Sequence, residues 1–528
     1  MILDHTIAAT LNAALKGLPL SAINWSPNGA PGWQNNLVER VLAADACDRM
    51  HIYKTAIAGL PDRAAIEAEV FSADRNMDLE KIPQTDIGNA EMLAAFYGDR
   101  LRFDHRRNRW LVWEKSRWVT DNDGEVQRLV IDTIRRRMEI VIHIQDSAKR
   151  KEAIKFCLQS ESASHYRAIA EIGKVLRPIT DNGKGWDADP WLLGCTNGVV
   201  DLKTGQLHQG HPTERISMST KQDYDPDAKA PRWEAFLSQV FNGDQEMISF
   251  VQKAFGYAIT GDVREQCLFL CWGGGANGKS TLLTTIRKAI GEYANNTSFS
   301  TFELSQRGSQ SNDLAALSAA RLVTAAETNE TSRLNEARVK AITGGDPITA
   351  RFLYSEYFDY IPGFKVFLAM NHLPAIYGTD TGIWRRIRLI PFTVSFLGRE
   401  DKTLDAQLEH ELPGILAWLV RGALLWQQDG LTPPETVTKA TEAYRMDSDL
   451  VLQFLESETV LHEKARIKAG DLYGLYLKWC QSNHDDPMNQ QTFGRRMRER
   501  GFEKIKQSGA HHYLGVGLPT EHGMFKDD

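Results

Sequence analysis

The feature that most constrains the fold of this chain is a glycine-rich loop between a predicted strand and a predicted helix. Residues 266–272 (QCLFLCW) are typical of a buried strand, and residues 281–293 (TLLTTIRKAIGEY) are typical of a helix. The sequence GGGANGKS between them fits the pattern G-x-x-x-x-G-K-S, with residues Gly273, Gly274, Gly275, Ala276, Asn277, Gly278, Lys279 and Ser280. Glycines let successive N–H groups turn towards phosphates, and the helix N-terminus adds a favourable dipole. The loop therefore predicts a nucleoside triphosphate site.

The residue types in this loop suggest ATP and Mg²⁺ as cofactors. We expect Lys279 to reach the β and γ phosphates and the Ser280 hydroxyl to bind Mg²⁺. Thr281 begins the packing of the helix behind the loop. Kinases, GTPases, packaging motors and helicases all share such a loop, so the loop alone leaves the reaction open.

Two further apolar strands end in polar residues suited to nucleotide chemistry. The strand 321–326 is followed by Glu327, which we expect to hold Mg²⁺ and orient the attacking water. Glu330 is the candidate for a second acid, and the alternative is that either acid only begins a helix. The strand 365–370 is followed by Asn371, whose amide is placed to sense the γ-phosphate.

An arginine pair, Arg385 and Arg386, precedes the apolar strand 387–392. Guanidinium groups that contact the γ-phosphate of a neighbouring subunit stabilise the charge of the transition state. Under that interpretation the enzyme works only as a ring. The alternative is a basic strand edge that forms structural salt bridges.

The length of 528 residues and the alternation of strands and helices predict a multidomain α/β protein. We expect a helical region at 1–85, an accessory α+β domain at 86–225, a P-loop ATPase domain at 226–440 and a compact domain at 441–528. The six cysteines are scattered, which predicts reduced thiols and no metal held by sulfur.

The sequence also bears on location and charge. No run approaches the ~18 apolar residues of a membrane-spanning helix, and Asp4 stands where a signal peptide has Lys or Arg, so we expect an intracellular protein with no membrane partner. The net charge of −6 hides basic clusters at 100–109, 135–137, 149–151 and 495–506. These clusters are either local nucleic-acid contacts or solvated helix faces.

The motifs together resemble the helicase region of a known family. The order GGGANGKS, LVTAAETNE, VKAITGGDPITARFLYSE, KVFLAMNHLP and GIWRRIRLIPF, over roughly 235–400, resembles the C-terminal helicase of the phage and plasmid primase-helicase family. That family belongs to the superfamily 3 helicases and is related to the poxvirus primase-helicase. Upstream, DIGNAEMLAAFYGDRLRFDHRRNRWLVW and LLGCTNGVVDLKTG resemble the domain that precedes the helicase in the same family.

The resemblance implies an AAA+-like ATPase that assembles as a hexameric ring around DNA and moves 3′ to 5′ along a single strand. It places Lys279 and Ser280 in Walker A, Glu327 in Walker B, Asn371 in the sensor motif, and Arg385 or Arg386 at the finger position. The stretch 340–354 matches an extra motif that precedes a hairpin entering the channel. Its candidate DNA or nucleotide contacts are Lys340, Arg351 and Tyr354.

Two departures from the family pattern stand out. Asn329 precedes Glu330 where relatives often carry consecutive acids, which leaves the second acid open. Many relatives carry a primase-polymerase domain, whereas about 85 residues precede the resemblance here. The spaced acid pairs Asp121/Asp123 and Asp187/Asp189 lie in turn-like segments, so we expect this chain to lack priming activity.

Residues 450–518 predict a winged-helix-like domain, with three helices and then two short strands around 508–509. We expect Phe493 and Met497 to face its core. The outward basic residues are expected to be Arg495, Arg496, Arg498 and Arg500 on the helix, with Lys504, Lys506, His511 and His512 on the wing. DNA contact is one interpretation; a protein-contact module or a solvated basic face is the other.

The sequence thus favours an ATP-dependent DNA helicase of phage, prophage or plasmid replication in the cytoplasm of a bacterial host. Its expected partners are single-stranded and forked DNA, further copies of the same chain, and a separate primase or polymerase. One alternative is a ring-forming DNA-binding NTPase switch, origin-binding or defence-related, that hydrolyses ATP without sustained unwinding. Another is a primase-helicase with cryptic nucleotidyl transfer, which would make labelled oligonucleotides from NTPs.

Overall fold

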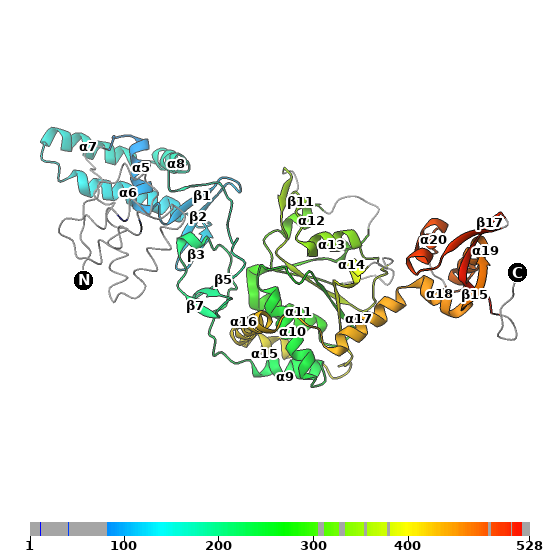
Figure 1. Cartoon of the computed structure of the whole chain (residues 1–528). Coiled ribbons are helices and arrows are strands. Elements are labelled where there is room, and N and C mark those ends of the chain that lie inside the picture. Colours follow the sequence, from blue (N-terminus) through cyan, green and yellow to red (C-terminus); the bar gives the residue numbers. More distant parts are fainter. Residues whose placement is uncertain are drawn as a thin grey trace. The chain divides into compact units, whose positions relative to one another are not determined.

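The computed structural model describes residues 82–304, 311–326, 333–352, 356–376, 381–483, 487–507 and 509–519, together with Leu11 and Val41 (Figure 1). The predicted helical region at 1–85 lies almost entirely outside these ranges. The described chain forms two compact units, one ending at Gly185 and the other beginning at Trp186, with Lys115–Arg117 assigned to the second unit. Together they form a multidomain α/β protein, as the sequence predicts.

The first unit is an α+β domain with a four-stranded sheet in the order β3-β2-β1-β4. Its elements are α5 (Asp86–Tyr97), β1 (Leu101–Asp104), β2 (Arg109–Glu114), β3 (Arg117–Thr120), α6 (Glu125–Val141), α7 (Ser147–Ser160), α8 (Ala163–Gly173) and β4 (Thr180–Asp181). Thr85 caps α5 by accepting a hydrogen bond from Gly88 N, and the Asp121 carboxylate accepts from three amides at the start of α6.

The second unit begins with a small antiparallel sheet, β5 (Leu192–Cys195), β6 (Gly198–Asp201) and β7 (Gln206–His208). The sequence places these strands in the accessory domain ending at 225, whereas in the structure they pack into the core of the second unit. Leu193 and Val200 are buried in the same core as Phe255 and Leu416, and Gly194 N donates to the Tyr293 hydroxyl at 2.8 Å. The sequence pattern predicts these apolar strands, but it does not show which core they pack into.

A five-stranded parallel sheet in the order β14-β8-β13-β10-β9 forms the centre of the second unit (Figure 1). The strands are β8 (Leu268–Trp272), β9 (Ala294–Ser298), β10 (Leu322–Ala326), β13 (Lys365–Met370) and β14 (Ile387–Pro391). Every residue of β13 is buried, as expected for a central parallel strand covered on both faces. Phe255 stacks on Phe367, and Phe367 stacks on Phe269, each with 4.3 Å between ring centroids.

Helices and one hairpin surround this sheet. They are α9 (Pro231–Val240), α10 (Gln245–Ala258), α11 (Lys279–Ile290), α12 (Ser311–Ala316), α13 (Glu336–Gly344), β11 (Ile348–Ala350), β12 (Phe358–Tyr360), α14 (Thr381–Trp384), α15 (Leu404–His410), α16 (Leu412–Asp429) and α17 (Glu435–Asp447). The predicted boundary at 440 falls inside α17. Tyr444 packs edge-on against Trp384 and is buried in the same core as residues of the five-stranded sheet, so α17 belongs with that sheet.

The C-terminal part contains three helices and a three-stranded sheet in the order β15-β17-β16. Its elements are α18 (Leu450–Glu458), β15 (Val460–Lys468), α19 (Ala469–Asn483), α20 (Gln490–Glu499), β16 (Lys504–Gln507) and β17 (Ala510–Gly517). The helices and the last two strands match the prediction, whereas β15 was not predicted. Phe493 and Met497 are buried, as expected, beside Phe454 and Tyr476.

Among the described residues, no helix has the length and apolarity needed to cross a membrane.

Candidate functional site

The glycine-rich loop follows β8 and leads directly into α11, which begins at Lys279. Two of its glycines are required by close packing: a Cβ on Gly273 would lie 2.3 Å from Phe392 O, and one on Gly278 would lie 2.8 Å from Val240 Cγ2. Gly274 and Gly275 have open space around them. The loop is thus anchored at both ends and accessible in the middle.

Lys279 is buried beside this open stretch. Its Nζ donates to Gly273 O at 2.6 Å, Gly274 O at 3.0 Å, Asn277 Oδ1 at 3.1 Å and Asn371 Oδ1 at 3.2 Å. Each of these four acceptors is a neutral oxygen. Burial lowers the pKa of Lys279 because it disfavours the charged ammonium. An anion bound at the loop would compensate that charge.

The contact between Lys279 and Asn371 joins positions that are 92 residues apart. Asn371 follows β13 directly, and β13 pairs in parallel with β8, so both residues lie at the carboxyl end of the sheet. Ligands of open α/β sheets bind at this end. The sequence assigns both residues to the nucleotide site, Lys279 from the glycine-rich loop and Asn371 from its place after a strand.

The other predicted residues of the nucleotide site are placed as follows. The Ser280 side chain is exposed in the first turn of α11, and Thr281 is half-buried. Asn277 is buried and donates to Phe392 O at 3.3 Å, and Ala276 O accepts from Phe396 N at 2.7 Å. Glu327 and Glu330 lie outside the described residues; β10, which leads to Glu327, lies directly beside β13.

The two arginines of the pair lie in different surroundings at the amino end of the sheet. Arg386 is 8% exposed and donates to Thr343 Oγ1 at 2.9 Å and Gly382 O at 2.5 Å. Arg385 is exposed and donates to Gln266 Oε1 at 3.0 Å. Only one member of the pair thus presents its guanidinium to solvent.

A hairpin of β11 and β12 is present, in which Ile348 pairs with Tyr360. It begins inside the stretch 340–354, whereas the sequence predicts the hairpin after that stretch. The Arg351 guanidinium lies 4.6 Å from the ring centroid of Tyr357, and Lys340 is half-buried on α13. Tyr354 lies outside the described residues. Sequence reasoning missed Phe352 and Tyr357, which are 47% and 61% exposed. Their exposure beside a basic residue could not be read from composition.

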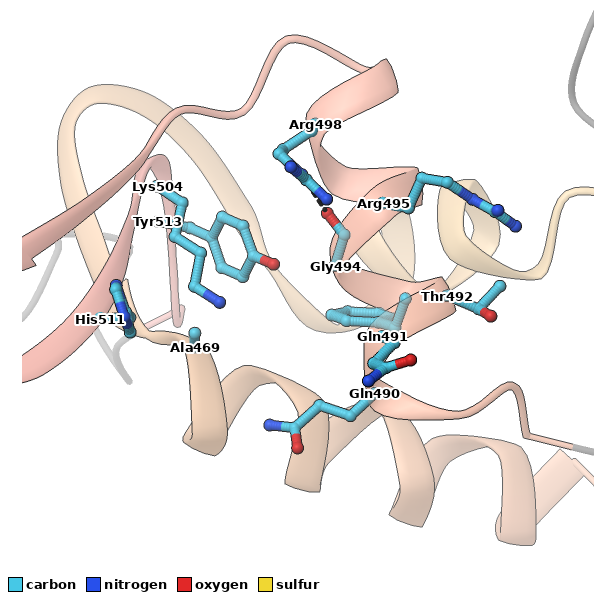
Figure 2. A pocket seen from close by; sticks show the side chains of 11 residues that line it. Ala469, Gln490, Gln491, Thr492, Gly494, Arg495, Arg498, Lys504, His511 and Tyr513 are labelled. Atoms are coloured by element: carbon cyan, nitrogen blue, oxygen red, sulfur yellow. Dashed lines mark hydrogen bonds between the residues drawn. The ribbon is translucent and has the colours of Figure 1, made fainter.

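A groove of about 840 Å³ opens in the C-terminal part between α20 and the β16–β17 hairpin (Figure 2). Three residues predicted to contact DNA line it, namely Arg495, Arg498 and Lys504. Lys506 is exposed outside this lining. Sequence reasoning missed Gln490 and Gln491, which also line the groove. An amide pair at the start of a basic helix was the signal available in the sequence.

Two of the helix arginines do not point outward, which corrects the sequence prediction. Arg496 is 8% exposed and forms an ion pair with Glu499 at 3.0 Å. Arg500 forms an ion pair with Asp449, and both side chains are largely buried. Residues three or four positions apart lie on the same face of a helix. Arg496 follows the buried Phe493 by three positions and Arg500 follows the buried Met497 by three, so both arginines lie near the core side.

The spaced acids in the turns have local structural partners. Asp121 caps α6, and Asp187 Oδ1 accepts from Ser217 N at 2.8 Å and Met218 N at 3.0 Å. Asp189 Oδ1 accepts from Trp191 N at 2.8 Å. Among the described residues, no group of three or more His, Cys, Asp or Glu side chains is arranged to hold a metal ion.

Comparison with known families gives three matches along the chain. Residues 90–242 match the family described as "D5 N terminal like", and residues 446–514 match "Poxvirus D5 protein-like". Between them, residues 271–386 match "Family of unknown function (DUF5906)".

Relatives of the chain occur in large DNA viruses. "Putative helicase L207/L206" of Acanthamoeba polyphaga mimivirus is 30% identical over 324 residues, which are 56% of this chain and 34% of that protein. "Putative helicase 022R" of Frog virus 3 is 27% identical over 388 residues, covering 56% of this chain and 39% of that protein. "Putative primase C962R" of African swine fever virus is 24% identical over 332 residues, covering 56% and 34%. The chain therefore spans about a third of the length of these relatives.

Among solved structures, the apo C-terminal region of NrS-1 aligns with a TM-score of 0.45 and 12% identity, over 81% of this chain and 99% of that one. The matches to the two poxvirus D5 families and to the viral helicases and primases confirm the resemblance predicted from the motifs: over the matched segments the chain is similar to primase-helicase proteins.

Proposed function

We propose that this chain is an ATP-dependent DNA helicase of a phage, prophage or plasmid replication system, which moves 3′ to 5′ along single-stranded DNA as a ring. The observation that carries the proposal is the meeting of Lys279 and Asn371 at 3.2 Å beside the glycine loop. β8 lies between β14 and β13, so the loop leaves the sheet where the strand order reverses, as in nucleotide-binding α/β folds. The order supports an AAA+-like superfamily 3 core.

The residues at the carboxyl end fit ATP and Mg²⁺. Exposed Gly274 and Gly275 leave their amides accessible to phosphate oxygens, and Lys279 supplies a positive charge that lacks a carboxylate among its four contacts. The exposed Ser280 hydroxyl stands at the start of α11, where it would hold Mg²⁺ together with Glu327. When bound, Mg²⁺ would neutralise charge on the transferred phosphoryl group.

The position of Arg385 supports the proposal that the protein works as a ring. Gln266, its partner, precedes β8, whereas the glycine loop follows β8, so the five residues of the strand separate the two ends by ~16 Å at 3.3 Å per residue. Arg385 therefore cannot contact a phosphate held by its own loop. Its exposed guanidinium is available to a neighbouring subunit, whereas Arg386 is enclosed. We assign the finger role to Arg385.

The hairpin and the C-terminal part supply candidate DNA contacts. Arg351 lies beside Tyr357, with exposed Phe352 on the same hairpin, which combines phosphate-binding charge with rings able to stack on bases. The C-terminal order of helix, strand, two helices and two strands supports a winged-helix-like domain. We propose that its basic groove binds DNA.

The function is tested by unwinding of forked duplexes that carry either a 3′ or a 5′ single-stranded tail, with ATP and Mg²⁺. Lys279→Ala protein is the blank, since it lacks the ammonium at the loop. We expect displacement from the 3′-tailed fork alone, and displacement only from the 5′ tail would contradict the polarity.

Two other outcomes would replace the proposal. DNA-stimulated ATP hydrolysis without displacement from either fork would identify a ring-forming NTPase switch. The name primase on one group of relatives makes nucleotidyl transfer the second candidate. Labelled oligonucleotides formed from NTPs with Mg²⁺ or Mn²⁺ would establish it, and a Lys279→Ala sample that still makes them would separate it from ATP-driven unwinding.

A further inference from the structure

The C-terminal groove has two chemically different walls. Its lining residues are Ala469, Gln490, Gln491, Thr492, Phe493, Gly494, Arg495, Arg498, Lys504, His511 and Tyr513. Figure 2 shows amides and arginines along α20 on one side and Lys504 with Tyr513 on the side of the strands. None of these residues is Asp or Glu, and the residues with a permanent charge, Arg495, Arg498 and Lys504, are positive. Such a groove attracts a polyanion.

The helix wall presents a regular stripe. Gln491, Arg495 and Arg498 are exposed and follow the spacing i, i+4, i+7, which places them on one face of α20. Phe493 and Met497 are fully buried on the opposite side and fix the rotation of the helix about its axis. The direction of the exposed stripe is therefore set by core packing rather than by the mobile side chains themselves.

The strand wall holds one cation in place. The Lys504 Nζ lies 5.7 Å from the ring centroid of Tyr513, whose ring is buried and packed in the core. On the helix, Arg498 Nε donates to Gly494 O at 3.4 Å. A Cβ at Gly494 would lie 3.2 Å from the Tyr513 hydroxyl, so glycine at this position lets the Tyr513 ring pack closely against α20.

The first turn of α20 carries groups that discriminate bases. Cations hold phosphates but carry no sequence information, whereas the amides of Gln490 and Gln491 offer a donor and an acceptor side by side. This pair matches N6 and N7 of adenine in the major groove, and an arginine such as Arg495 matches O6 and N7 of guanine. Recognition helices present their N-terminal residues to base edges. In α20 the amides of Gln490 and Gln491 are at the N-terminal end and the arginines follow, so the amides are the groups placed to reach base edges.

We propose that the C-terminal groove reads duplex DNA sequence: Gln490, Gln491 and Arg495 contact base edges in the major groove, while Arg498 and Lys504 hold the adjacent backbone. The proposal deepens the DNA-binding role proposed above and rests on it only for that part of the chain. It makes no use of ATP hydrolysis. This chain would thus recognise a specific duplex site through residues separate from its nucleotide site.

The test is selection of binding sites from a random-sequence duplex library by the full chain carrying Lys279→Ala, at fixed salt. Hydrolysis is not needed for this readout, so a failure to unwind forks leaves the selection informative, and the reverse also holds. We expect a short motif to be enriched that contains adenine and guanine contacts. Binding of the chain to every duplex with equal affinity would overturn the proposal.

Matched variants distinguish recognition of bases from binding of the DNA backbone. Gln491→Ala is expected to relax the motif at one base pair, with a loss of discrimination of roughly 5- to 100-fold at that position. Lys504→Ala is expected to weaken binding to all duplexes alike and to lower the salt slope by about 1. Lys478→Ala, an exposed cation on α19 outside the groove, is the control and should change neither quantity.

The same comparison contains the results that would contradict the proposal. If Gln490→Ala and Gln491→Ala both enrich the wild-type motif, base reading by α20 is wrong. If Lys504→Ala binds duplex DNA as Lys478→Ala does, the groove does not hold the backbone and is a protein-contact surface instead. Circular dichroism of each variant distinguishes these results from loss of folding.

Discussion

Each end of the five-stranded sheet has a buried lysine. The two lysines donate similar hydrogen bonds to neutral oxygens, but they differ in whether a ligand can reach them. At the carboxyl end, Lys279 donates to four neutral oxygens beside Gly274 and Gly275, which have open space around them. At the amino end, Lys365 donates to three carbonyls, those of Thr260 at 2.5 Å, Asp262 at 3.1 Å and Gly363 at 3.1 Å. Lys365 is 2% exposed. The same cation can thus be a ligand-binding group or a structural one.

Access, rather than charge or hydrogen bonding, distinguishes the two roles. Arg321 repeats the structural pattern at the amino end, since it donates to the carbonyls of Asp189, Leu192 and Ile259. These bonds tie the segment before the small sheet to the start of β10. A buried cation that is enclosed by its own chain joins loops, whereas one beside open glycines remains available to an anion.

Unlike Lys365 and Arg321, Arg385 is an exposed cation at the amino end of the sheet. Its removal should have the largest effect of the changes considered, a loss of ATP hydrolysis. Arg385→Ala is expected to lower kcat for ATP hydrolysis by roughly 10³-fold or more while nucleotide binding persists, because a finger acts on transition-state charge. Steady-state hydrolysis and nucleotide binding by fluorescence measure the two quantities. Mixing Arg385→Ala with Lys279→Ala should restore part of the activity, since each subunit supplies what its neighbour lacks.

Arg386→Ala is the matched control for this prediction. Its loss leaves Thr343 and the Gly382 carbonyl without their partner in a buried setting, so unfolding should become easier by about 1–3 kcal/mol. Denaturant titration measures that change. If Arg385→Ala hydrolyses ATP normally, or if mixed rings stay inactive, Arg385 does not act between subunits.

At the carboxyl end, Lys279→Ala should reduce ATP hydrolysis by roughly 10²- to 10³-fold, because a preorganised positive group is lost where negative charge develops. It should not reduce the free energy of unfolding, since the ammonium is penalised by burial in the free protein. Hydrolysis and denaturant titration are compared on the same sample. A variant that unfolds much more easily would assign Lys279 the structural role that Lys365 has.

The sequence predicted the sheet well because its central strands are continuous apolar runs that end in glycine, asparagine or acid. It missed β9 (ANNTS) and β15 (VLHEKARIK), whose residues are mostly polar and are kept in place by pairing with a neighbour. Pairing is a long-range property that no local pattern contains. The core that β5 and β6 join was not predicted for the same reason, because an apolar strand pattern does not show which core the strand enters.

The candidate site was predicted where residue type and strand end coincide, as at Lys279 and Asn371. The difference between Arg385 and Arg386 was not accessible, because adjacent arginines have the same chemistry and only the fold determines which one is enclosed. Phe352 and Tyr357 were missed because aromatic residues near strands usually enter a core. Exposure, not identity, marks them as functional candidates.

The hairpin β11–β12 ends five residues before Lys365, the first residue of β13, and the exposed Phe352 and Tyr357 flank the turn between its two strands. Tyr357→Ala and Phe352→Ala should each weaken binding of single-stranded DNA by about 1–3 kcal/mol through lost base stacking. Fluorescence anisotropy with an oligonucleotide measures this. Ile361→Ala, which removes an exposed aliphatic group at the hairpin base, is the control. Equal losses in all three variants would exclude stacking.

The smallest effect concerns the pH dependence of stability at Lys365. Burial, reinforced by the charge of Arg321, lowers the pKa of Lys365 well below its ordinary value. At pH values between the folded and unfolded pKa of Lys365, the unfolded chain binds more protons than the folded chain. The free energy of unfolding therefore rises with pH in this range, and it falls again as pH is lowered from about 10. The slope cannot exceed about 1.4 kcal/mol per pH unit for one group. Because Lys365→Met removes the titrating group, the difference in unfolding free energy between wild type and variant should change with pH over this range. A constant difference would mean that the Lys365 ammonium is as stable inside the fold as in water, and access alone would no longer separate the two ends of the sheet.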